Sequence, residues 1–397
     1  MSSEINALIG TPAAWQTLEA QGCPEISPVS QGVCQVTFWW RDPHGDERHS
    51  PVRHVWLVVT GITDHHGSPH PVSLVRVPGT DAWTLTLTLD AHWRGSYCLV
   101  PDIHVFPADI VGDRRQWQSL LTGAIADPLN PFSWSGGRGH PVSGLSLPFA
   151  PPQPAWDAAE LSFPEPWCFS WRSARLGNVR RVWVCETGEG GAQRPLAMLL
   201  DGQFWAQSMP IFPVLHRLTR EGVLPPAVYV LVDAIDTTWR SAELPCNPTF
   251  WQAVQDDLLP QVARRAAFSS DPARTVVAGQ SFGGLSALYA GLTWPARIGA
   301  VLSLSGSFWW PSREAGGMTG QLLTQLETGA LTARGLRIYL EAGRHEPIIA
   351  TANARLCRIL AGHPALKFSE VEGGHDALCW RGGIIAGLAW LWQSGPG

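Results

Sequence analysis

Six short, continuously apolar segments in the second half of the chain constrain its fold more than any other feature. They lie at residues 195–202, 227–236, 275–281, 299–307, 336–343 and 366–374. A continuous apolar run is typical of a parallel strand that helices cover on both faces. The stretches between the segments leave room for such helices. We therefore expect a doubly wound, mostly parallel α/β sheet in this half of the chain.

Residues 247–268, between two of these segments, carry the signals of a helix start. Asn247 is a suitable N-cap, and Pro248 would occupy the first helical position. Apolar side chains then recur at helical spacing, at Phe250, Val254 and Leu258. Pro260 is expected to kink or interrupt this helix, because its ring blocks a backbone hydrogen bond.

The first part of the chain has a different pattern. From about Val33 to Phe106, short alternating runs are bounded by Gly, Pro and Asp. This spacing predicts an antiparallel, immunoglobulin-like β-sandwich. Residues 135–157 are rich in Gly and Pro and lack helical periodicity, so they are expected to form a linker. The predicted domains are therefore a β-sandwich at 1–150 and an α/β domain at 151–397.

Composition excludes several classes of protein. Apolar residues make up 45% of the 397 and charged residues 15%, which is typical of a globular protein. A net charge of −5 gives no support for general nucleic-acid binding. The N-terminus lacks the pattern of a secretory signal, and no stretch has the apolar length of a membrane span. The eight cysteines show no C-x-x-C spacing, so we expect reduced thiols and a cytoplasmic location.

Residues Gly279–Gly283 form the pattern G-x-S-x-G, with Ser281 at its centre. An apolar strand precedes the pattern and an apolar helical stretch follows it. In this context the pattern predicts a nucleophile elbow and an α/β-hydrolase fold, with Ser281 as the nucleophile. The glycines are needed because a tight strand-to-helix reversal has no room for neighbouring side chains. A plain glycine-rich turn is the alternative.

A serine hydroxyl needs a base within hydrogen-bond reach. His375 lies in a glycine-rich turn after the last predicted strand, where a loop can bring it to the serine. His345 follows an earlier strand, where this fold usually places its acid, and His363 lies in a turn at a helix end. We expect His375 to be the general base; a turn-capping histidine is the alternative.

The acid must be a glutamate if the usual order of serine, acid and histidine holds, because no aspartate lies between Ser281 and His375. Glu346 lies in the loop beyond a strand end and can turn towards the histidine. Glu341, at the strand end itself, and a serine–histidine dyad without an acid remain alternatives. The other glutamates lie in expected lid, helix or last-strand segments: Glu314, Glu327, Glu370 and Glu372.

Ester hydrolysis also needs backbone N–H donors for the oxyanion. One donor is expected at Phe282, the residue after the nucleophile. The other is expected in the loop after the strand at 195–202, at Gly202 or Gln203. Because backbone donors carry no side-chain signature, this assignment rests on position in the fold alone.

Several blocks of sequence, in the same order, resemble the enterochelin (enterobactin) esterases. In the first part these are VTFWWRDPHG, VTGITDHH, WRGSYC, IADPLN and GGRGH. In the second part they are PLAMLLDGQFWAQSMP, PPAVYVLVDAIDTTWRSAELPCN, RTVVAGQSFGGLSALYAGL and VEGGHDALCWRGG. The resemblance covers nearly the whole chain and is far more specific than the G-x-S-x-G pattern alone.

The resemblance implies a cytoplasmic serine esterase that opens the trilactone of ferric enterobactin and yields dihydroxybenzoylserine products. The family's nucleophile and general base match Ser281 and His375. The partner would be a ferric catecholate siderophore, and no binding to nucleic acid or to a membrane is expected. The resemblance leaves the oligomeric state open. No cofactor or resident metal is expected, because the iron arrives with the substrate. His65 and His66 invite a metal hypothesis, but we interpret them as loop histidines.

Such a substrate is anionic and carries flat aromatic rings, so its cleft should supply guanidinium groups and indoles. Tryptophan is abundant, with 21 residues against 4 tyrosines. Three Trp–Arg pairs are candidate substrate contacts, and the second is best placed because it follows a predicted strand end. A surface arginine beside a packed tryptophan is the alternative for each. The pairs are Trp93 with Arg94, Trp239 with Arg240, and Trp380 with Arg381.

Two other functions are compatible with these residues. One keeps the triad and changes the substrate to a glucosylated enterobactin (salmochelin) or another aromatic ester, such as a feruloyl ester. The other makes the β-sandwich a ligand-binding module and the α/β half a scaffold. A complete set of elbow, base and candidate acid favours an enzyme. The β-sandwich is then expected to form a wall or cap of the substrate cleft.

Overall fold

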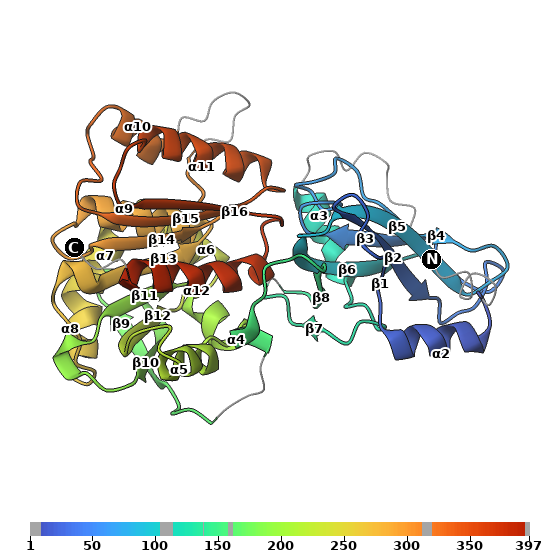
Figure 1. The fold of residues 1–397 in the computed structure, drawn as a ribbon, viewed down its shortest axis with the longest axis horizontal. Coiled ribbons are helices and arrows are strands. Elements are labelled where there is room, and N and C mark those ends of the chain that lie inside the picture. Colours follow the sequence, from blue (N-terminus) through green and yellow to red (C-terminus); the bar gives the residue numbers. More distant parts are fainter. Residues whose placement is uncertain (1–8, 104–113, 138, 158–161, 312–319, 394–397) are drawn as a thin grey trace. The chain divides into compact units, whose positions relative to one another are not determined.

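The computed structural model describes residues 9–103, 114–137, 139–157, 162–311 and 320–393 (Figure 1). The chain divides into two compact units. The N-terminal unit contains Met1–Pro152 together with two short later segments, Arg344–Glu346 and Glu372–Cys379. The C-terminal unit contains Gln153–Gly343, Pro347–Val371 and Trp380–Gly397. Glu314 lies outside the described residues.

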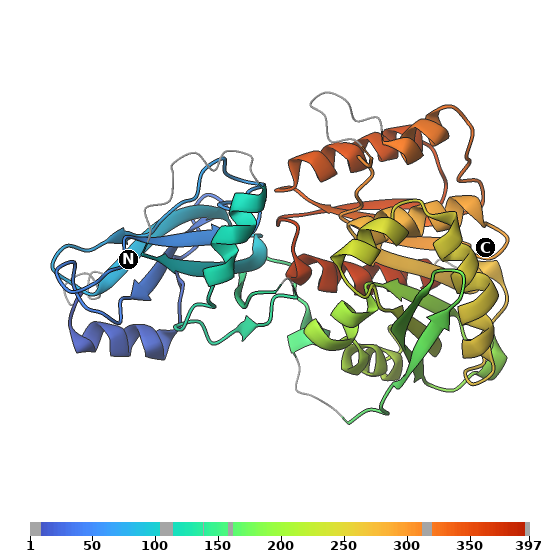
Figure 2. The same cartoon turned by 180° about the vertical axis from the view of Figure 1, so that it is seen from behind.

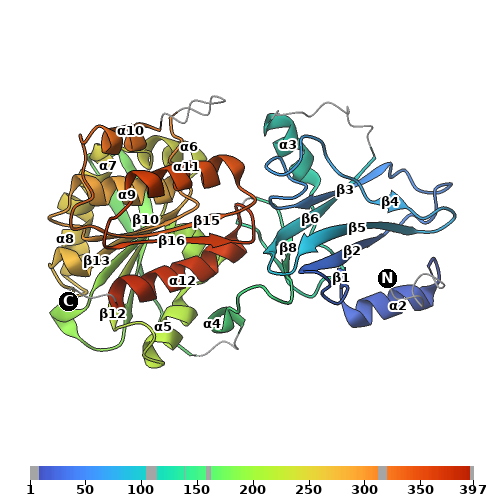
Figure 3. The ribbon, with the colours of Figure 1, turned by 45° about the horizontal axis from the view of Figure 1, so that its top comes forward.

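Two antiparallel sheets form the N-terminal unit (Figure 3). The first has the order β1 (Glu25–Ile26), β2 (Val33–Arg41), β5 (Ala82–Asp90) and β4 (Val75–Arg76). The second has the order β3 (His54–Val59), β6 (Arg94–Asp102), β8 (Val142–Ser146) and β7 (Ser133–Trp134). The described helices of this unit's first segment are α2 (Pro12–Gln21), α3 (Arg114–Leu120) and a 3₁₀ turn at Leu121–Gly123.

Both sheets contribute side chains to one hydrophobic core. Phe38 of β2, Leu57 of β3 and Leu99 of β6 are fully buried in the same cluster. In an antiparallel sheet alternate residues point to one face, so this shared cluster means that the two sheets pack face to face. The predicted alternation between Val33 and Phe106 therefore corresponds to real strands, within the part of that range that is described.

The predicted linker at 135–157 is wrong in part, because it contains β8. This strand pairs with β6 in the second sheet. Gly144 lies in β8, and a Cβ atom there would come within 2.3 Å of the Phe132 ring. The glycine thus serves close packing, which composition alone does not distinguish from a flexible connection.

One eight-stranded sheet forms the centre of the C-terminal unit, in the order β16-β15-β14-β13-β11-β12-β10-β9. The strands from β16 to β12 in this order run parallel, as predicted from the apolar segments. The edge hairpin of β9 and β10 is antiparallel and was not predicted. The bounds are β9 (Trp167–Ser173), β10 (Asn178–Thr187), β11 (Leu196–Leu200), β12 (Ala227–Val232), β13 (Thr275–Gln280), β14 (Ala300–Leu304), β15 (Arg337–Gly343) and β16 (Leu366–Val371).

Helices cover both faces of this sheet (Figures 2 and 3). Gly291 of α9 (Phe282–Thr293) lies against Val301, whereas Gly387 of α12 (Ala377–Gln393) lies against Leu302. Val301 and Leu302 are neighbours on β14 and so point to opposite faces. The other α-helices among the described residues of this unit are α4 (Pro154–Asp157), α5 (Phe212–Arg220), α6 (Thr237–Glu243), α7 (Pro248–Ala253), α8 (Leu259–Ala263), α10 (Gln321–Glu327) and α11 (Pro347–Ile359).

The predicted helix start at residue 247 is confirmed. The Asn247 side chain accepts hydrogen bonds from the backbone N–H groups of Thr249 and Phe250. The predicted interruption is also present, because a π-helical turn at Val254–Leu258 separates α7 from α8, and Pro260 lies in the first turn of α8. Among the described helices, none is both long and apolar enough to cross a membrane.

The strand order reverses next to β11. The chain passes from β11 to β12 on one side and later enters β13 on the other side of β11. In open α/β sheets, ligands bind at such a switch point, outside the carboxyl ends of the strands. The loop after β11 and the turn after β13 are therefore the first places to look for a site.

Candidate functional site

Ser281 occupies a sharp turn between β13 and α9. Its backbone has φ 58° and ψ −119°, a conformation that few residues with side chains adopt. A Cβ atom at Gly279 would lie 2.6 Å from the backbone of Gly283, and one at Gly284 would lie 2.4 Å from Ser303 Oγ. The glycines around Ser281 are thus required by the tightness of the turn, as the sequence pattern predicted.

A residue with a strained backbone conformation lies after the carboxyl end of each of four neighbouring strands. Asp201 after β11, Ile235 after β12, Ser281 after β13 and Ser305 after β14 all have positive φ. Each such residue costs about 1–3 kcal/mol, and such residues cluster at functional sites. The region at the carboxyl ends of these strands is therefore the candidate site of the C-terminal unit.

The hydroxyl of Ser307 lies beside that of Ser281, with 3.3 Å between the two Oγ atoms. The Ser281 N–H donates to the carbonyl of Leu304, and the Ser307 N–H donates to the carbonyl of Ser281. Ser307 is buried, and it was not predicted. Its sequence signal is weak, because it is one of two serines in the short segment SGS after β14.

The predicted oxyanion donors lie on both sides of the switch point. Phe282 is the first residue of α9, where a backbone N–H has no acceptor within the helix. Gly202 follows β11, and a Cβ atom there would lie 2.6 Å from the backbone nitrogen of Val232. The side chain of Gln203 accepts a hydrogen bond from the Ala234 N–H at 2.9 Å, which ties its loop to the end of β12.

Arg240 supports the turn that carries Ser281. Its guanidinium donates to both carboxylate oxygens of Asp201, at 2.6 and 2.8 Å, and to the carbonyl of Gln280 at 3.3 Å. Burial alone would lower the pKa of Arg240, but the Asp201 carboxylate raises it above its ordinary value. The guanidinium that was predicted to bind substrate is therefore engaged in bonds that hold the elbow.

His375 and Glu346 form a hydrogen-bonded pair in the N-terminal unit. His375 Nδ1 lies 2.6 Å from Glu346 Oε2. The exposed fractions of the two side chains are 13% and 1%. A carboxylate at Nδ1 holds the proton on that nitrogen and makes Nε2 the acceptor, which is the arrangement that a general base requires.

The other candidate acids have different surroundings. The carboxylate of Glu341 packs against α12, where a Cβ atom at Gly383 would lie 2.3 Å from Glu341 Oε1. Glu372 binds His345, with 2.5 Å between Oε1 and Nε2. Glu327 forms an ion pair with Arg355.

The remaining candidate histidine has both ring nitrogens bonded to backbone groups. His363 Nε2 lies 2.9 Å from the carbonyl oxygen of Ala333. Its Nδ1 accepts the N–H of Ala365. Both nitrogens are thus engaged with the backbone, and His363 lies in the connection between α11 and β16.

Of the three predicted Trp–Arg pairs, only Trp239 has a substantially exposed indole, with 36% of its surface accessible. Trp93 has no exposed surface and lies in the core of the N-terminal unit, which does not support its predicted contact with substrate. Arg94 is nearly buried and donates to Ser146 Oγ. The last pair is buried as well: Trp380 donates to Ser305 Oγ, and Arg381 donates to the side chain of Gln153.

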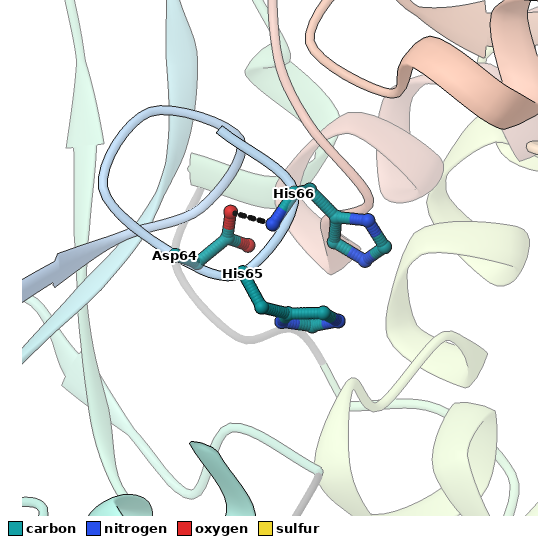
Figure 4. A group of neighbouring side chains, drawn as sticks. All are labelled: Asp64, His65 and His66. Atoms are coloured by element: carbon teal, nitrogen blue, oxygen red, sulfur yellow. Dashed lines mark hydrogen bonds between the residues drawn. The ribbon is translucent and has the colours of Figure 1, made fainter. Parts of the chain in front are cut away.

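Asp64, His65 and His66 are gathered in one loop after β3 (Figure 4). One atom of each side chain that could bind a metal ion lies within 4.8 Å of the corresponding atoms of the other two. A single carboxylate oxygen of Asp64 accepts the backbone N–H groups of His66 and Gly67, which closes the turn. The His66 ring lies 6.0 Å from the ring of His375, measured between centroids. The two histidines therefore lie in a turn that Asp64 caps, and the ligand atoms of the three side chains are close enough to hold one metal ion.

A cavity of about 660 Å³ lies at the amino-terminal ends of the strands of the large sheet. Its lining includes Pro272, Gly299 and Arg337, which precede or begin β13, β14 and β15. Ligand sites of open α/β sheets lie outside the carboxyl ends of the strands. This cavity is therefore not the candidate site.

Comparison with known proteins covers both parts of the chain. Residues 35–156 match the family model "Enterochelin esterase, N-terminal", and residues 173–391 match "Putative esterase". The iron(III) enterobactin esterase of Escherichia coli O6:H1 is 54% identical over 97% of each chain. The iron(III) salmochelin esterase of the same strain is 29% identical, over 95% of this chain and 92% of its own.

Solved structures agree with this result. The ferric enterobactin esterase of Salmonella typhimurium is 53% identical and covers 96% of this chain and 99% of its own, with a TM-score of 0.91. The Shigella flexneri enterobactin esterase, solved in the presence of enterobactin, is 52% identical over 97% and 99%, with a TM-score of 0.88. These identities extend over nearly the full length, and the chain therefore belongs to the iron(III) enterobactin esterase family.

Proposed function

We propose that this protein hydrolyses the ester bonds of the ferric enterobactin trilactone and releases dihydroxybenzoylserine products. The observation that carries the proposal is the strained Ser281 elbow in a chain that also holds an imidazole–carboxylate pair, at 2.6 Å, in its last loops. Relatives that share more than half of the residues are named for this activity.

The proposed mechanism is acyl transfer through Ser281. His375 Nε2 takes the hydroxyl proton while Oγ attacks an ester carbonyl, and Glu346 stabilises the imidazolium that forms. The backbone N–H of Phe282 and one from Gly202 or Gln203 bind the oxyanion. The imidazolium then protonates the leaving alkoxide. A water molecule, activated by the same imidazole, hydrolyses the acyl-enzyme and frees Ser281.

Ring opening explains the consequence for iron. The macrocycle holds three catechols at high effective concentration around one ferric ion, and each cut removes part of that advantage. Weaker chelation makes release of the iron easier. The serine mechanism balances its protons through His375 and water, so we propose that the only metal involved is the iron of the substrate.

The N-terminal unit is proposed to be an immunoglobulin-like domain that forms a wall or cap of the substrate cleft, with the α/β-hydrolase domain beginning near residue 151. Its two packed antiparallel sheets support the first part. The proposed location is cytoplasmic, which agrees with the eight cysteines, all of them described and none in a disulfide. Trp239 is the proposed aromatic contact for a catechol ring, because its indole is exposed at the start of α6.

A glucosylated enterobactin is the second candidate substrate, supported by the full-length match to a salmochelin esterase. The much higher identity to enterobactin esterases favours the first candidate. The test compares kcat/KM for ferric enterobactin, its glucosylated form and a feruloyl ester, with products identified by mass spectrometry. The proposal requires the highest value for ferric enterobactin. A higher value for either other ester would replace it.

A further inference from the structure

The proposed base and acid belong to the N-terminal unit by their contacts, although they come late in the sequence. Glu346 ends the segment Arg344–Glu346, which follows β15, and His375 lies in the segment Glu372–Cys379, which follows β16. The contacts that place these two segments in the N-terminal unit surround His375 closely.

The residue after His375 makes the most direct of these contacts. The buried carboxylate of Asp376 accepts the backbone N–H of Ser96 at 2.8 Å and the Ser96 hydroxyl at 3.1 Å. It also accepts the backbone N–H of Leu378 at 2.8 Å. Ser96 lies on β6 of the second sheet, 280 residues earlier in the chain. A carboxylate with three donors in a buried place has one fixed orientation.

The chain on either side of His375 is also bound to Arg94, the first residue of β6. The Arg94 N–H donates to the carbonyl of Glu372 at 3.0 Å. The thiol of Cys379 donates to the carbonyl of Arg94 at 3.4 Å. A Cβ atom at Gly373 would lie 2.7 Å from the same carbonyl oxygen, so a side chain at this position would not fit against β6.

A turn after β3 touches both catalytic segments at once. Gly61 has φ +77°, and a Cβ atom there would lie 2.6 Å from His345 Cβ and 3.0 Å from Gly374 Cα. The two segments are joined to each other by the His345 N–H, which donates to the carbonyl of Gly373. Gly61 thus packs against the neighbours of both Glu346 and His375.

We infer that the N-terminal unit positions the general base, through the Ser96–Asp376 bonds and the packing of Gly61 against the two segments. Asp376, Ser96 and Gly61 are positioning residues that act through His375. The physical reason is that a misplacement of a catalytic group by about 1 Å can cost about 100-fold in rate. This inference rests on the proposed function, because it needs His375 as the base.

Asp376→Ala removes the fixed carboxylate, and Asp127→Ala is its matched control. Asp127 is also buried, accepts hydrogen bonds from Tyr97 Oη and the Leu129 N–H, and so anchors the next residue of β6. We expect Asp376→Ala to lower kcat by about 30- to 100-fold with KM for ferric enterobactin changed less than about threefold. Asp127→Ala should stay within about threefold of the wild type once rates are normalised to the folded fraction measured by near-ultraviolet circular dichroism.

Two further variants keep the inference testable if an alanine variant does not fold. Asp376→Asn retains one acceptor oxygen and should recover part of the lost kcat. Gly61→Ala introduces a clash with both segments, whereas Gly79→Ala adds the same kind of backbone strain, at φ +73°, with no atom within 4 Å. We expect a loss of about tenfold or more in kcat for Gly61→Ala and less than about twofold for Gly79→Ala.

The two levels of the argument fail in different ways. If Asp376→Ala loses no more kcat than Asp127→Ala, or if Gly61→Ala matches Gly79→Ala, the positioning role is overturned while the esterase proposal stands. If Ser281→Ala and His375→Ala both retain wild-type turnover, the proposed function itself is wrong. The inference is supported if Asp376→Ala and Gly61→Ala lose kcat while their controls, Asp127→Ala and Gly79→Ala, do not.

Discussion

Replacement of Glu346 by glutamine tests the proposed acid. The carboxylate is 1% exposed and lies 2.6 Å from His375 Nδ1, so the change removes a buried charge from a short hydrogen bond while conserving shape. A hydrogen bond to a charged group contributes about 1.5–3 kcal/mol, and loss of one member of a buried pair costs about 3–5 kcal/mol. We take the loss of transition-state stabilisation as about 2–4 kcal/mol, because the imidazole is charged in that state. This loss predicts a fall in kcat of about 30- to 1,000-fold.

The matched control is Glu341→Gln, which alters a buried carboxylate that packs against α12. We expect this variant to keep kcat within about threefold of the wild type. The assay is the initial rate of ester cleavage in ferric enterobactin at saturating substrate, with KM determined separately. The reasoning is refuted if Glu346→Gln keeps more than about a third of the wild-type kcat, or if Glu341→Gln loses more than Glu346→Gln.

Two further predictions concern acid stability and substrate contact. Burial alone would raise the pKa of Asp42, but hydrogen bonds, including those from Ser50 and Arg76, hold it below its ordinary value of 3.8. Its contribution is therefore present above pH 3.8 and lost as the pH falls through the folded-state pKa. Asp42→Asn should lower the free energy of unfolding by about 2–3 kcal/mol at pH 7, and urea titrations should show this difference shrinking below pH 3.8; a constant difference would contradict it. Trp239→Ala should raise KM for ferric enterobactin about two- to tenfold and leave kcat unchanged, whereas Phe149→Ala, another exposed aromatic, should change neither.

The central strands of the large sheet could be predicted because burial on both faces makes their sequences continuously apolar. The edge strand β9 alternates between buried and exposed residues and pairs antiparallel with β10, so that signal is absent. Strand β8 was hidden for a different reason. Its Gly144 allows close packing against Phe132, and sequence composition alone does not distinguish such a glycine from a flexible one.

The elbow was predictable because its requirements are local. A tight turn between a strand and a helix needs glycines at fixed offsets from Ser281, and these stand in the sequence. The surroundings of Trp93 and Arg240 were not predictable, because a Trp–Arg pair has the same sequence in a core, in a cleft or beside a buried aspartate. The bond between Ser96 and Asp376 joins residues far apart in the chain, and only the folded structure brings them together.

The turnover of Ser281→Ala on ferric enterobactin tests the central claim most directly. The backbone of the elbow remains, and only the hydroxyl is removed. We predict that kcat falls by at least about 10³-fold, in keeping with the loss of a nucleophile that acts as one unit with its base, while the variant still binds the substrate. Turnover equal to that of the wild type would contradict the account, because Ser281 would then take no part in the chemistry.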